Sequence, residues 1–307
     1  MTARLRIGTR GSPLARVQTA LACRALEEAH PELAVPGALE VVVIRTTGDQ
    51  AVDRPLAELG GKGLFCKEIE AALLAGDIDI AVHSMKDLPT WLPEGLIIGA
   101  VLPREDPRDV LIARAGEDLD DLPGAAVVGT ASVRRRTQLL ARRSDLRIVN
   151  FRGNVETRLR KLAAGEVNAT VLALAGLKRL GIEPAGAVIL APEVMLPAVG
   201  QGAIGIECRE NDDDARALLA AVDDPASSAC LRAERALLAA LDGSCDTPIA
   251  GHAELDGGGL SLRALIARPD GSECLRAARS GTIADGAALG RDAGRELKTR
   301  AGPGFFD

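Results

Sequence analysis

The sequence predicts an α/β protein with two lobes and a small α+β domain at its C-terminal end. Short apolar runs alternate with amphipathic helical segments, which is typical of mainly parallel sheets covered by helices. This alternation is interrupted at two stretches rich in proline and glycine, 103–107 and 192–202, and it restarts between them. From about Pro225 it gives way to a long helix, three strands and a final helix.

Length and composition favour a folded intracellular protein. With 307 residues, 47% of them apolar, the chain is long enough for two or three domains. No apolar run approaches the roughly 20 residues that span a bilayer, and the first residues lack the apolar core of a secretory signal. The six cysteines are scattered without CxxC spacing, which argues against both a disulfide framework and a metal site. We therefore expect a cytoplasmic protein without a membrane partner.

The charge pattern indicates a small anionic ligand. A net charge of −6 disfavours nucleic-acid binding, and four Phe, one Trp and no Tyr leave few rings for stacking on bases. Arginine is nevertheless concentrated in one segment of this acidic chain, and its guanidinium group binds carboxylate or phosphate in a bidentate manner. The members of this segment are Arg134, Arg135, Arg136, Arg142, Arg143, Arg147, Arg152, Arg158 and Arg160.

The first lobe opens with a strand and a helix. Residues 5–7 form a strand that we expect to break at Gly8, and Ser12 is a good N-cap for a helix that starts with Pro13. A polar turn before a helix N-terminus can bind an anion, although a capped helix with one surface arginine explains the segment equally well. The anion site would be lined by Thr9, Arg10 and Ser12, and the apolar helix face would comprise Leu14, Val17, Leu21 and Ala25.

Two further segments of this lobe are expected to support it. Residues 39–44 alternate too little for a half-exposed strand. The sequence GGKGLF at 60–65 is not a P-loop; it predicts either a mobile loop that brings Lys62 over a bound anion or an ordinary flexible turn. The helix after it should bury Phe65, Ile69, Ala72 and Leu73.

The stretch 77–89, DIDIAVHSMKDLP, has the strongest signature of a reactive site. A short buried strand ends in His83, Ser84, Lys86 and Asp87, and Pro89 prevents its simple continuation. Polar side chains at the end of a buried strand are how α/β domains place reactive groups beside a cleft. His83 is the exception, because a histidine with an ordinary structural role in the core is the simpler interpretation.

The second lobe repeats features of the first. Ile7-Gly8-Thr9 with Ser12 resembles Val128-Gly129-Thr130 with Ser132, which predicts two helix N-termini able to bind anions. Arg134 and Arg135 lie in the first turn of the second helix, where cations oppose the helix dipole, so we expect a negatively charged ligand to hold them there. Arg152 and Arg158 flank another helix start, capped by Asn154, although a solvated charged face is an alternative.

The predicted domains are 1–102 with 202–221, the inserted lobe 106–196, and 224–307. A two-stranded hinge would join the lobes and permit closure over a ligand. In the last domain Cys245 lies in a loop, DGSCDTP, where it is either a nucleophile or attachment point or an inert thiol.

Nine stretches together resemble one family, porphobilinogen deaminase, also called hydroxymethylbilane synthase. They are TRGSPLA, GGKGLF, DIAVHSMKDLP, EDPRD, GTASVRRR, FRGNVETRL, LALAGLKRLG, LPAVGQGAIGIE and the Cys245 loop. The resemblance implies lobes like those of periplasmic binding proteins. It also implies an enzyme that joins four porphobilinogen molecules head to tail, with release of ammonia, on a covalently bound dipyrromethane primer. Asp246-Thr247 after Cys245 departs from many relatives and leaves the packing of that loop uncertain.

The resemblance also implies residue roles. Asp87 matches the catalytic carboxylate and Cys245 the thioether attachment of the primer. Primer contacts match Ser84, Lys86, Thr130, Ser132, Arg134 and Arg135; substrate and chain contacts match Arg10, Ser12, Gln18, Lys62, Arg152, Arg158 and Arg179. The target of Arg136 stays open, and we expect a monomer. Two rival interpretations are a non-catalytic two-lobed binding protein for a small anion and a phosphate-handling transferase.

Overall fold

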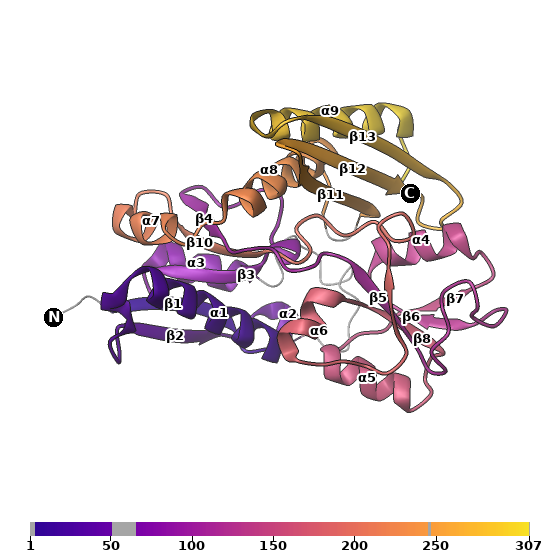
Figure 1. Ribbon diagram of the computed structural model, residues 1–307, viewed down its shortest axis with the longest axis horizontal. Coiled ribbons are helices and arrows are strands. Elements are labelled where there is room, and N and C mark those ends of the chain that lie inside the picture. The colour runs from indigo at the N-terminus through magenta and orange to yellow at the C-terminus, as the bar shows by residue number, and fades with distance from the viewer. Residues whose placement is uncertain (1–3, 51–65, 245–246, 307) are drawn as a thin grey trace. The chain divides into compact units, whose positions relative to one another are not determined.

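The computed structural model describes residues 4–50, 66–244 and 247–306. Its contacts divide the chain into two units (Figure 1), and each is described by itself. Unit 1 comprises Met1–Glu105 and Ala203–Ser228, and unit 2 comprises Asp106–Gly202 and Ala229–Asp307. Of the helices in these described ranges, none combines the length and the apolar character needed to cross a membrane.

Unit 1 is built on a five-stranded sheet with the order β2-β1-β3-β10-β4. Strand β1 runs parallel to β2 and β3, whereas β10 is antiparallel to β3 and β4. Strand β10 therefore returns the chain to this first sheet. The strands are β1 (Leu5–Arg10), β2 (Leu39–Ile44), β3 (Ile80–Ser84), β4 (Leu96–Val101) and β10 (Ile204–Arg209).

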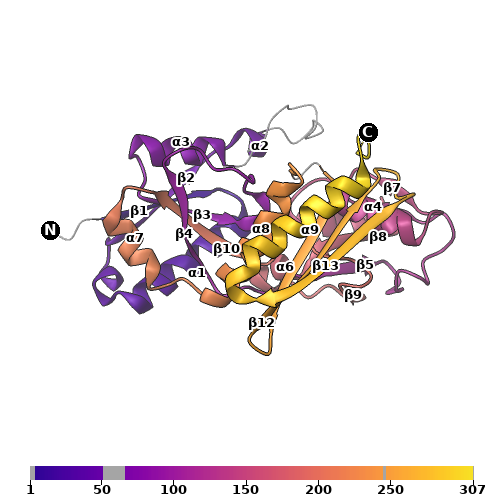
Figure 2. The same cartoon turned by 90° about the horizontal axis from the view of Figure 1, so that it is seen from above.

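Helices cover both faces of this sheet because its central strands alternate between two cores. Figure 2 shows α3 (Lys67–Ala75) on one face, with α1 (Pro13–Ala29) and α7 (Asp213–Ala220) on the other. Ile80 and Val82 belong to the core on the α1 and α7 side, and Ala81 belongs to the core on the α3 side. The remaining short elements are η1 (Pro31–Ala34), α2 (Thr47–Gln50) and η3 (Met85–Asp87).

The first sheet of unit 2 repeats this plan, with the order β7-β6-β8-β5-β9. Parallel strands β7, β6 and β8 are followed by the antiparallel β5. Helix α4 (Val133–Arg142) packs on one face, and α5 (Val155–Ala163) and α6 (Leu174–Leu180) pack on the other. The strands are β5 (Asp109–Ala113), β6 (Val127–Gly129), β7 (Arg147–Val149), β8 (Ala169–Ala173) and β9 (Ala187–Leu190).

The end of the chain adds an antiparallel sheet of three strands, β11-β12-β13, to unit 2. Helices α8 (Pro225–Ala240) and α9 (Gly286–Ala301) cover one face of it. The strands are β11 (Ile249–Asp256), β12 (Gly259–Ala267) and β13 (Cys274–Thr282), and η4 (Ile283–Asp285) precedes α9. The predicted fold class is confirmed, whereas the exact domain bounds and the closure about a hinge stay predictions.

Three local expectations were wrong. Strand β1 does not break at Gly8, because residues 8–10 continue to pair with 42–44 of β2. Strand β2 is half exposed, since it lies at the sheet edge and leaves Val41 and Val43 open to solvent. The buried face of α1 is rotated by one residue from the expected one, and comprises Gln18, Thr19, Ala22 and Leu26.

The similarity between the two lobes has a physical basis in two glycines. A Cβ atom on Gly8 would lie 2.3 Å from Cδ1 of Ile78, and one on Gly129 would lie 2.6 Å from Cγ of Phe151. Each glycine therefore allows a large apolar side chain to pack directly on the strand that leads to a capped helix. The same requirement at equivalent positions explains the repeated Gly-Thr sequence.

Candidate functional site

The turn that carries Asp87 extends directly from strand β3. The strand ends at Ser84, and η3 spans Met85–Asp87, with Leu88 in extended conformation before Pro89. The backbone N–H of Met85 donates to the carbonyl of Ala203, 3.0 Å away, which ties the turn to the strand next to it. Met85 is buried, while Lys86 and Asp87 are partly exposed. The turn therefore has a fixed base and presents its charged side chains toward solvent.

Helix α1 supplies the first partner of this turn. Nε2 of Gln18 donates to Oγ of Ser84 at 2.8 Å, and that hydroxyl lies 3.0 Å from Oε1 of the same amide. The structure thus brings together two residues that were predicted separately, one as a substrate contact and one as a primer contact. Gln18 is itself buried at 4% exposure, so the pair has a defined position.

Thr9 does not line an anion site, contrary to expectation. It is fully buried within β1, and its hydroxyl accepts a hydrogen bond of 2.7 Å from Thr19 of α1. Ser12 acts as the N-cap of α1, since its Oγ accepts from the backbone N–H of Ala15 at 3.3 Å. Arg10 is the last residue of β1 and is partly exposed. Of the three predicted residues, only Arg10 and Ser12 are accessible at this helix start.

The equivalent helix start in unit 2 has the predicted capping. Ser132 is the N-cap of α4 and accepts from the backbone N–H of Arg135 at 3.4 Å. Oγ1 of Thr130 accepts from the backbone N–H of Ser132 at 3.1 Å, and Thr130 is buried. Together the two hydroxyl groups fix the turn between β6 and α4.

Arg134 and Arg135 are held by a protein carboxylate that the sequence did not reveal. Asp109, the first residue of β5, is fully buried; Nη2 of Arg134 lies 2.7 Å from its Oδ2, and Nη2 of Arg135 lies 2.8 Å from its Oδ1. Gln201 donates to the same Oδ1 from 2.9 Å. We expected a ligand's negative charge to explain these arginines better than stability does; Asp109 corrects this, because the protein itself supplies negative charge at the helix start.

Electrostatics at Asp109 show how strongly the three groups interact. Burial raises the pKa of the Asp109 carboxyl, but the two guanidinium groups outweigh it and lower that pKa to about 2. Burial also lowers the pKa of Arg134, and Asp109 opposes that effect. Three charged groups share one buried site with net positive charge, so the site favours an additional anion.

Backbone carbonyls take up two further donors of this arginine pair, and one donor lacks a partner among the described residues. Nη1 of Arg134 donates to the carbonyl of Leu196 at 2.7 Å, and Nη1 of Arg135 donates to that of Val171 at 2.9 Å. Nε of Arg134 is buried and has no hydrogen-bond partner among the described residues. A buried N–H that lacks a partner is the kind of donor that a ligand oxygen would satisfy.

The other predicted arginines of unit 2 are partly exposed. Nε of Arg158 donates to the carbonyl of Gly153 at 2.8 Å, close to the predicted cap of α5, where Asn154 accepts from Thr157. Nη2 of Arg179 donates to the carbonyl of Gly202 at 2.6 Å. Arg152 precedes that cap and is also partly exposed, whereas Arg136 is exposed on α4. Cys245 and Lys62 lie outside the described residues.

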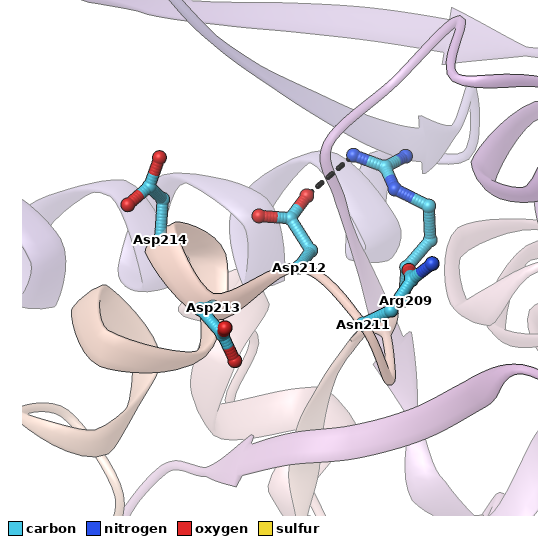
Figure 3. Close-up of a pocket in the computed structure, with 5 residues that line it drawn as sticks. All are labelled: Arg209, Asn211, Asp212, Asp213 and Asp214. Atoms are coloured by element: carbon cyan, nitrogen blue, oxygen red, sulfur yellow. Dashed lines mark hydrogen bonds and ion pairs between the residues drawn. The ribbon is translucent and has the colours of Figure 1, made fainter.

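The hollow drawn in Figure 3 is not part of this site. It has a volume of about 320 Å³ and is lined by Arg209 and by residues 211–214 at the start of α7. Asp212 caps that helix and pairs with Arg209 at 2.5 Å. An acidic helix start stabilised by its own cap and ion pair is a structural feature. Among the described residues, no group of three or more His, Cys, Asp or Glu could hold a metal ion.

Sequence reasoning overlooked Asp109. Its sole signal was an acidic residue at the head of an apolar strand, DVLIA, within the EDPRD stretch. A charged residue that begins a fully buried strand requires a buried partner, which was sufficient reason to search for one.

Comparison with known proteins covers nearly the whole chain. Residues 5–217 match the family model described as "Porphobilinogen deaminase, dipyromethane cofactor binding domain", and residues 228–299 match the C-terminal domain of the same family. A porphobilinogen deaminase from Paracoccus denitrificans is 56% identical over 303 residues, which cover 99% of this chain and 96% of that protein. The chloroplastic porphobilinogen deaminase of rice, Oryza sativa, is 53% identical over 306 residues, 99% of this chain and 86% of that protein.

Solved structures of similar shape are more distant. The periplasmic aliphatic sulphonate binding protein SsuA from Escherichia coli has a TM-score of 0.43 and 16% identity, covering 78% of this chain and 70% of that one. An arginine-specific periplasmic binding protein from Salmonella typhimurium has a TM-score of 0.41 and 13% identity, covering 72% and 92%. The similarity in sequence extends over almost the full length of the chain, so this chain belongs to the porphobilinogen deaminase family.

Proposed function

We propose that the protein is a hydroxymethylbilane synthase in which Asp87 is the catalytic carboxylate. The family assignment, which extends over both matched segments, supports the overall reaction: four porphobilinogen molecules are joined head to tail, and each joining step releases ammonia. The position of Asp87 supports its role. It lies on a turn with an anchored base, beside the Gln18–Ser84 pair, and its side chain is partly exposed.

Asp87 has two tasks in this proposal. Loss of ammonia breaks the bond between carbon and nitrogen in porphobilinogen, and the leaving nitrogen requires a proton, which the carboxyl group of Asp87 would deliver. The carbon skeleton left behind is a cationic azafulvene, and the resulting carboxylate stabilises that positive charge. The pyrrole carbon of the growing chain then bonds to the azafulvene carbon and loses its own proton, which returns Asp87 to the acid form. One group therefore donates the proton and then balances the charge that remains on carbon when ammonia departs.

The cationic residues bind the carboxylates that the pyrrole units carry. Each unit has an acetate and a propionate, so the number of carboxylates grows with every unit added. Arg134, Arg135, Thr130 and Ser132 in unit 2, with Ser84 and Lys86 in unit 1, would hold the dipyrromethane, and Cys245 would form its thioether. The buried Nε of Arg134 supports this assignment, since it lacks a partner among the described residues. When bound, the dipyrromethane supplies the pyrrole carbon to which the first substrate unit is joined.

The contacts to substrate and growing chain are assigned to arginines with partly exposed side chains. Arg10, Arg152, Arg158 and Arg179 are all of this kind. Ser12 would contribute its hydroxyl at the start of α1, and Gln18 the amide that bonds to Ser84. Lys62 would contribute a further cation. We also propose that the protein acts in the cytoplasm as a monomer. Family membership gives no support to the alternative of a non-catalytic binding protein.

Replacing Asp87 by Asn tests the catalytic role. Asp87→Asn keeps the size of the side chain but removes both the proton and the negative charge, so turnover should fall by at least about 10²-fold, the usual contribution of acid–base catalysis. Hydroxymethylbilane formation would be measured alongside circular dichroism. Near-normal turnover by a folded variant would refute this role.

Intact-protein mass spectrometry tests the cofactor assignment. The purified protein should exceed its sequence mass by one dipyrromethane, and Cys245→Ala should lose that excess. Cys208→Ala is a matched control, because Cys208 is fully buried and should leave the excess mass unchanged. An active enzyme with the unmodified sequence mass would contradict the thioether.

A further inference from the structure

Directly behind the Asp87 turn, unit 1 contains a group of ionisable side chains that the proposed reaction does not use. We call it the buried acid cluster and define it as Cys66, Glu70, His83 and Glu207. All four are buried, at 1%, 5%, 7% and 1% exposure. Carboxylic acids are seldom buried to this extent unless they are paired, so the presence of two requires an explanation.

Strand register places the members on one face of the sheet. In the antiparallel pair of β3 and β10, His83 lies opposite Gly205, and Ala81 lies opposite Glu207. Paired residues share a face, as do residues two apart, so His83 and Glu207 are diagonal neighbours on the face of Ala81. Ala81 packs against Ile69 and Leu73 of α3, the helix that also carries Glu70. Glu70 therefore lies on the helix that covers this face.

The cluster has fewer hydrogen bonds than its charges require. Nε2 of His83 lies 3.1 Å from Oε2 of Glu207, but without the geometry of a hydrogen bond. Among the described residues, both carboxylate oxygens of Glu207 lack a hydrogen-bond partner, and so does Oε1 of Glu70. Burial raises the pKa of Glu70, with a further increase from Glu207; the Cys66 thiol and His83 act in the opposite direction. Two carboxylates near a single imidazole cannot both be neutralised, so this site retains negative charge or takes up a proton.

The Asp87 turn rests on the same face of the sheet. Gly205, opposite His83, has no side chain because a Cβ atom there would lie 2.0 Å from Sδ of Met85. Met85 of η3 thus covers the face that carries His83 and Glu207, and its backbone is bonded to Ala203 two residues earlier in the chain than Gly205. Burial is the main cause of a raised pKa at Cys66, followed by Glu70, and both Glu207 and Asp87 contribute. The thiol is therefore within electrostatic reach of Asp87 and the cluster together.

We propose that Glu70, His83 and Glu207 are positioning residues for the reaction, which support the Asp87 turn and set the negative charge behind it. This inference rests on the proposed role of Asp87. A negative charge nearby makes a carboxyl group retain its proton at higher pH, and a group that must both deliver a proton and carry charge benefits from this. The other charged side chains near this face have separate partners: Arg209 pairs with Asp212, and Glu68 accepts from Thr47. Lys67 of α3 is exposed.

Replacement of the buried carboxylates by amides tests the inference. In Glu207→Gln and Glu70→Gln, the alkaline limb of the kcat–pH profile, along which Asp87 loses the proton that it delivers, should move to lower pH by about one unit, with KM little changed. Glu207→Asp keeps the charge and should restore the wild-type limb. Glu94→Gln, which removes an exposed carboxylate from the same unit, is the matched control and should leave the profile unshifted.

Two control measurements and a second variant make the outcome decisive. Circular dichroism and intact mass show whether each variant is folded and carries the dipyrromethane, and Glu70→Gln decides the question where Glu207→Gln fails to fold. A uniform loss of kcat at all pH values, with no movement of the alkaline limb, would mean that the cluster is only structural and would overturn the inference. If Asp87→Asn retains turnover, the proposed function fails first; if Asp87→Asn is inactive and the limb does not move, only this inference fails.

Discussion

Each unit buries carboxylates in its main sheet or in a helix packed on it, but their surroundings differ. In unit 2, Asp109 is fully buried between two guanidinium groups, and the pKa of its carboxyl is lowered to about 2 in spite of burial. In unit 1, Glu70 and Glu207 have one imidazole near them, and burial together with Glu207 raises the pKa of Glu70. One site has excess positive charge and the other excess negative charge.

The difference suggests a division of electrostatic work between the two units. A buried site with excess positive charge suits the binding of ligand carboxylates, and a buried site with excess negative charge suits the handling of a proton and a cation. Burial amplifies both effects, because neither site can be screened well by water or salt. The two sites should therefore respond in opposite ways to substitution and to pH.

The largest effect is expected at Asp109. Asp109→Asn leaves Arg134 and Arg135 buried without their counter-charge, so the free energy of unfolding of unit 2 should fall by about 3–5 kcal/mol. Urea denaturation followed by circular dichroism would measure this. Asp120→Asn removes an exposed carboxylate that pairs with Arg142, and it should change stability little. Equal effects of the two substitutions would contradict the importance of burial.

Because of Asp109, we also expect the protein to lose stability in acid. The carboxyl of Asp109 has a pKa below its unfolded value, so its contribution is complete above about pH 4 and is lost as pH falls toward about 2. Wild-type protein should lose stability across that interval, and Asp109→Asn should lose less. The free energy of unfolding of both proteins would be measured between about pH 5 and pH 2, a range that includes the folded and unfolded pKa values of Asp109. An equal loss of stability in the two proteins would be evidence against the charge pairing.

Glu70 should behave in the opposite way. Its pKa is raised, so the ionised carboxylate costs stability above the folded pKa and costs none below the unfolded value. Glu70→Gln should therefore stabilise the protein at pH 8, by roughly 0.5–2 kcal/mol, the usual size of a stabilising substitution. The gain should shrink toward pH 4. Thermal unfolding at several pH values would measure it, with Glu94→Gln as the control; a gain that does not depend on pH would contradict the electrostatic explanation.

The smallest effects are expected at the helix N-caps, a feature that both units share. Ser12 and Ser132 cap equivalent helices, so Ser12→Ala and Ser132→Ala should each destabilise the protein by about 1 kcal/mol. Urea denaturation of both variants would compare the two lobes directly, with Ser280→Ala on the exposed side of β13 as the control. A cost at one cap but not at the other would show that the two helix starts are not equivalent.

Sequence alone determined the features that depend on neighbouring residues. The caps at Ser12, Ser132 and Asn154 follow from side chains that bond to the backbone three residues further on, so their local sequence was sufficient. The α/β class and family membership also followed, because alternating apolar runs and long motifs are written directly in the chain.

Only the tertiary structure decided which charges meet. Arg134 is 25 residues from Asp109 in the chain, and His83 meets Glu207 only because β3 and β10 are adjacent in the sheet. Strand order also made β2 an exposed edge, and packing of α1 buried Gln18 and Thr19 in place of the expected apolar face. Pairing between distant strands depends on the geometry of the whole sheet, which no local pattern of residues encodes.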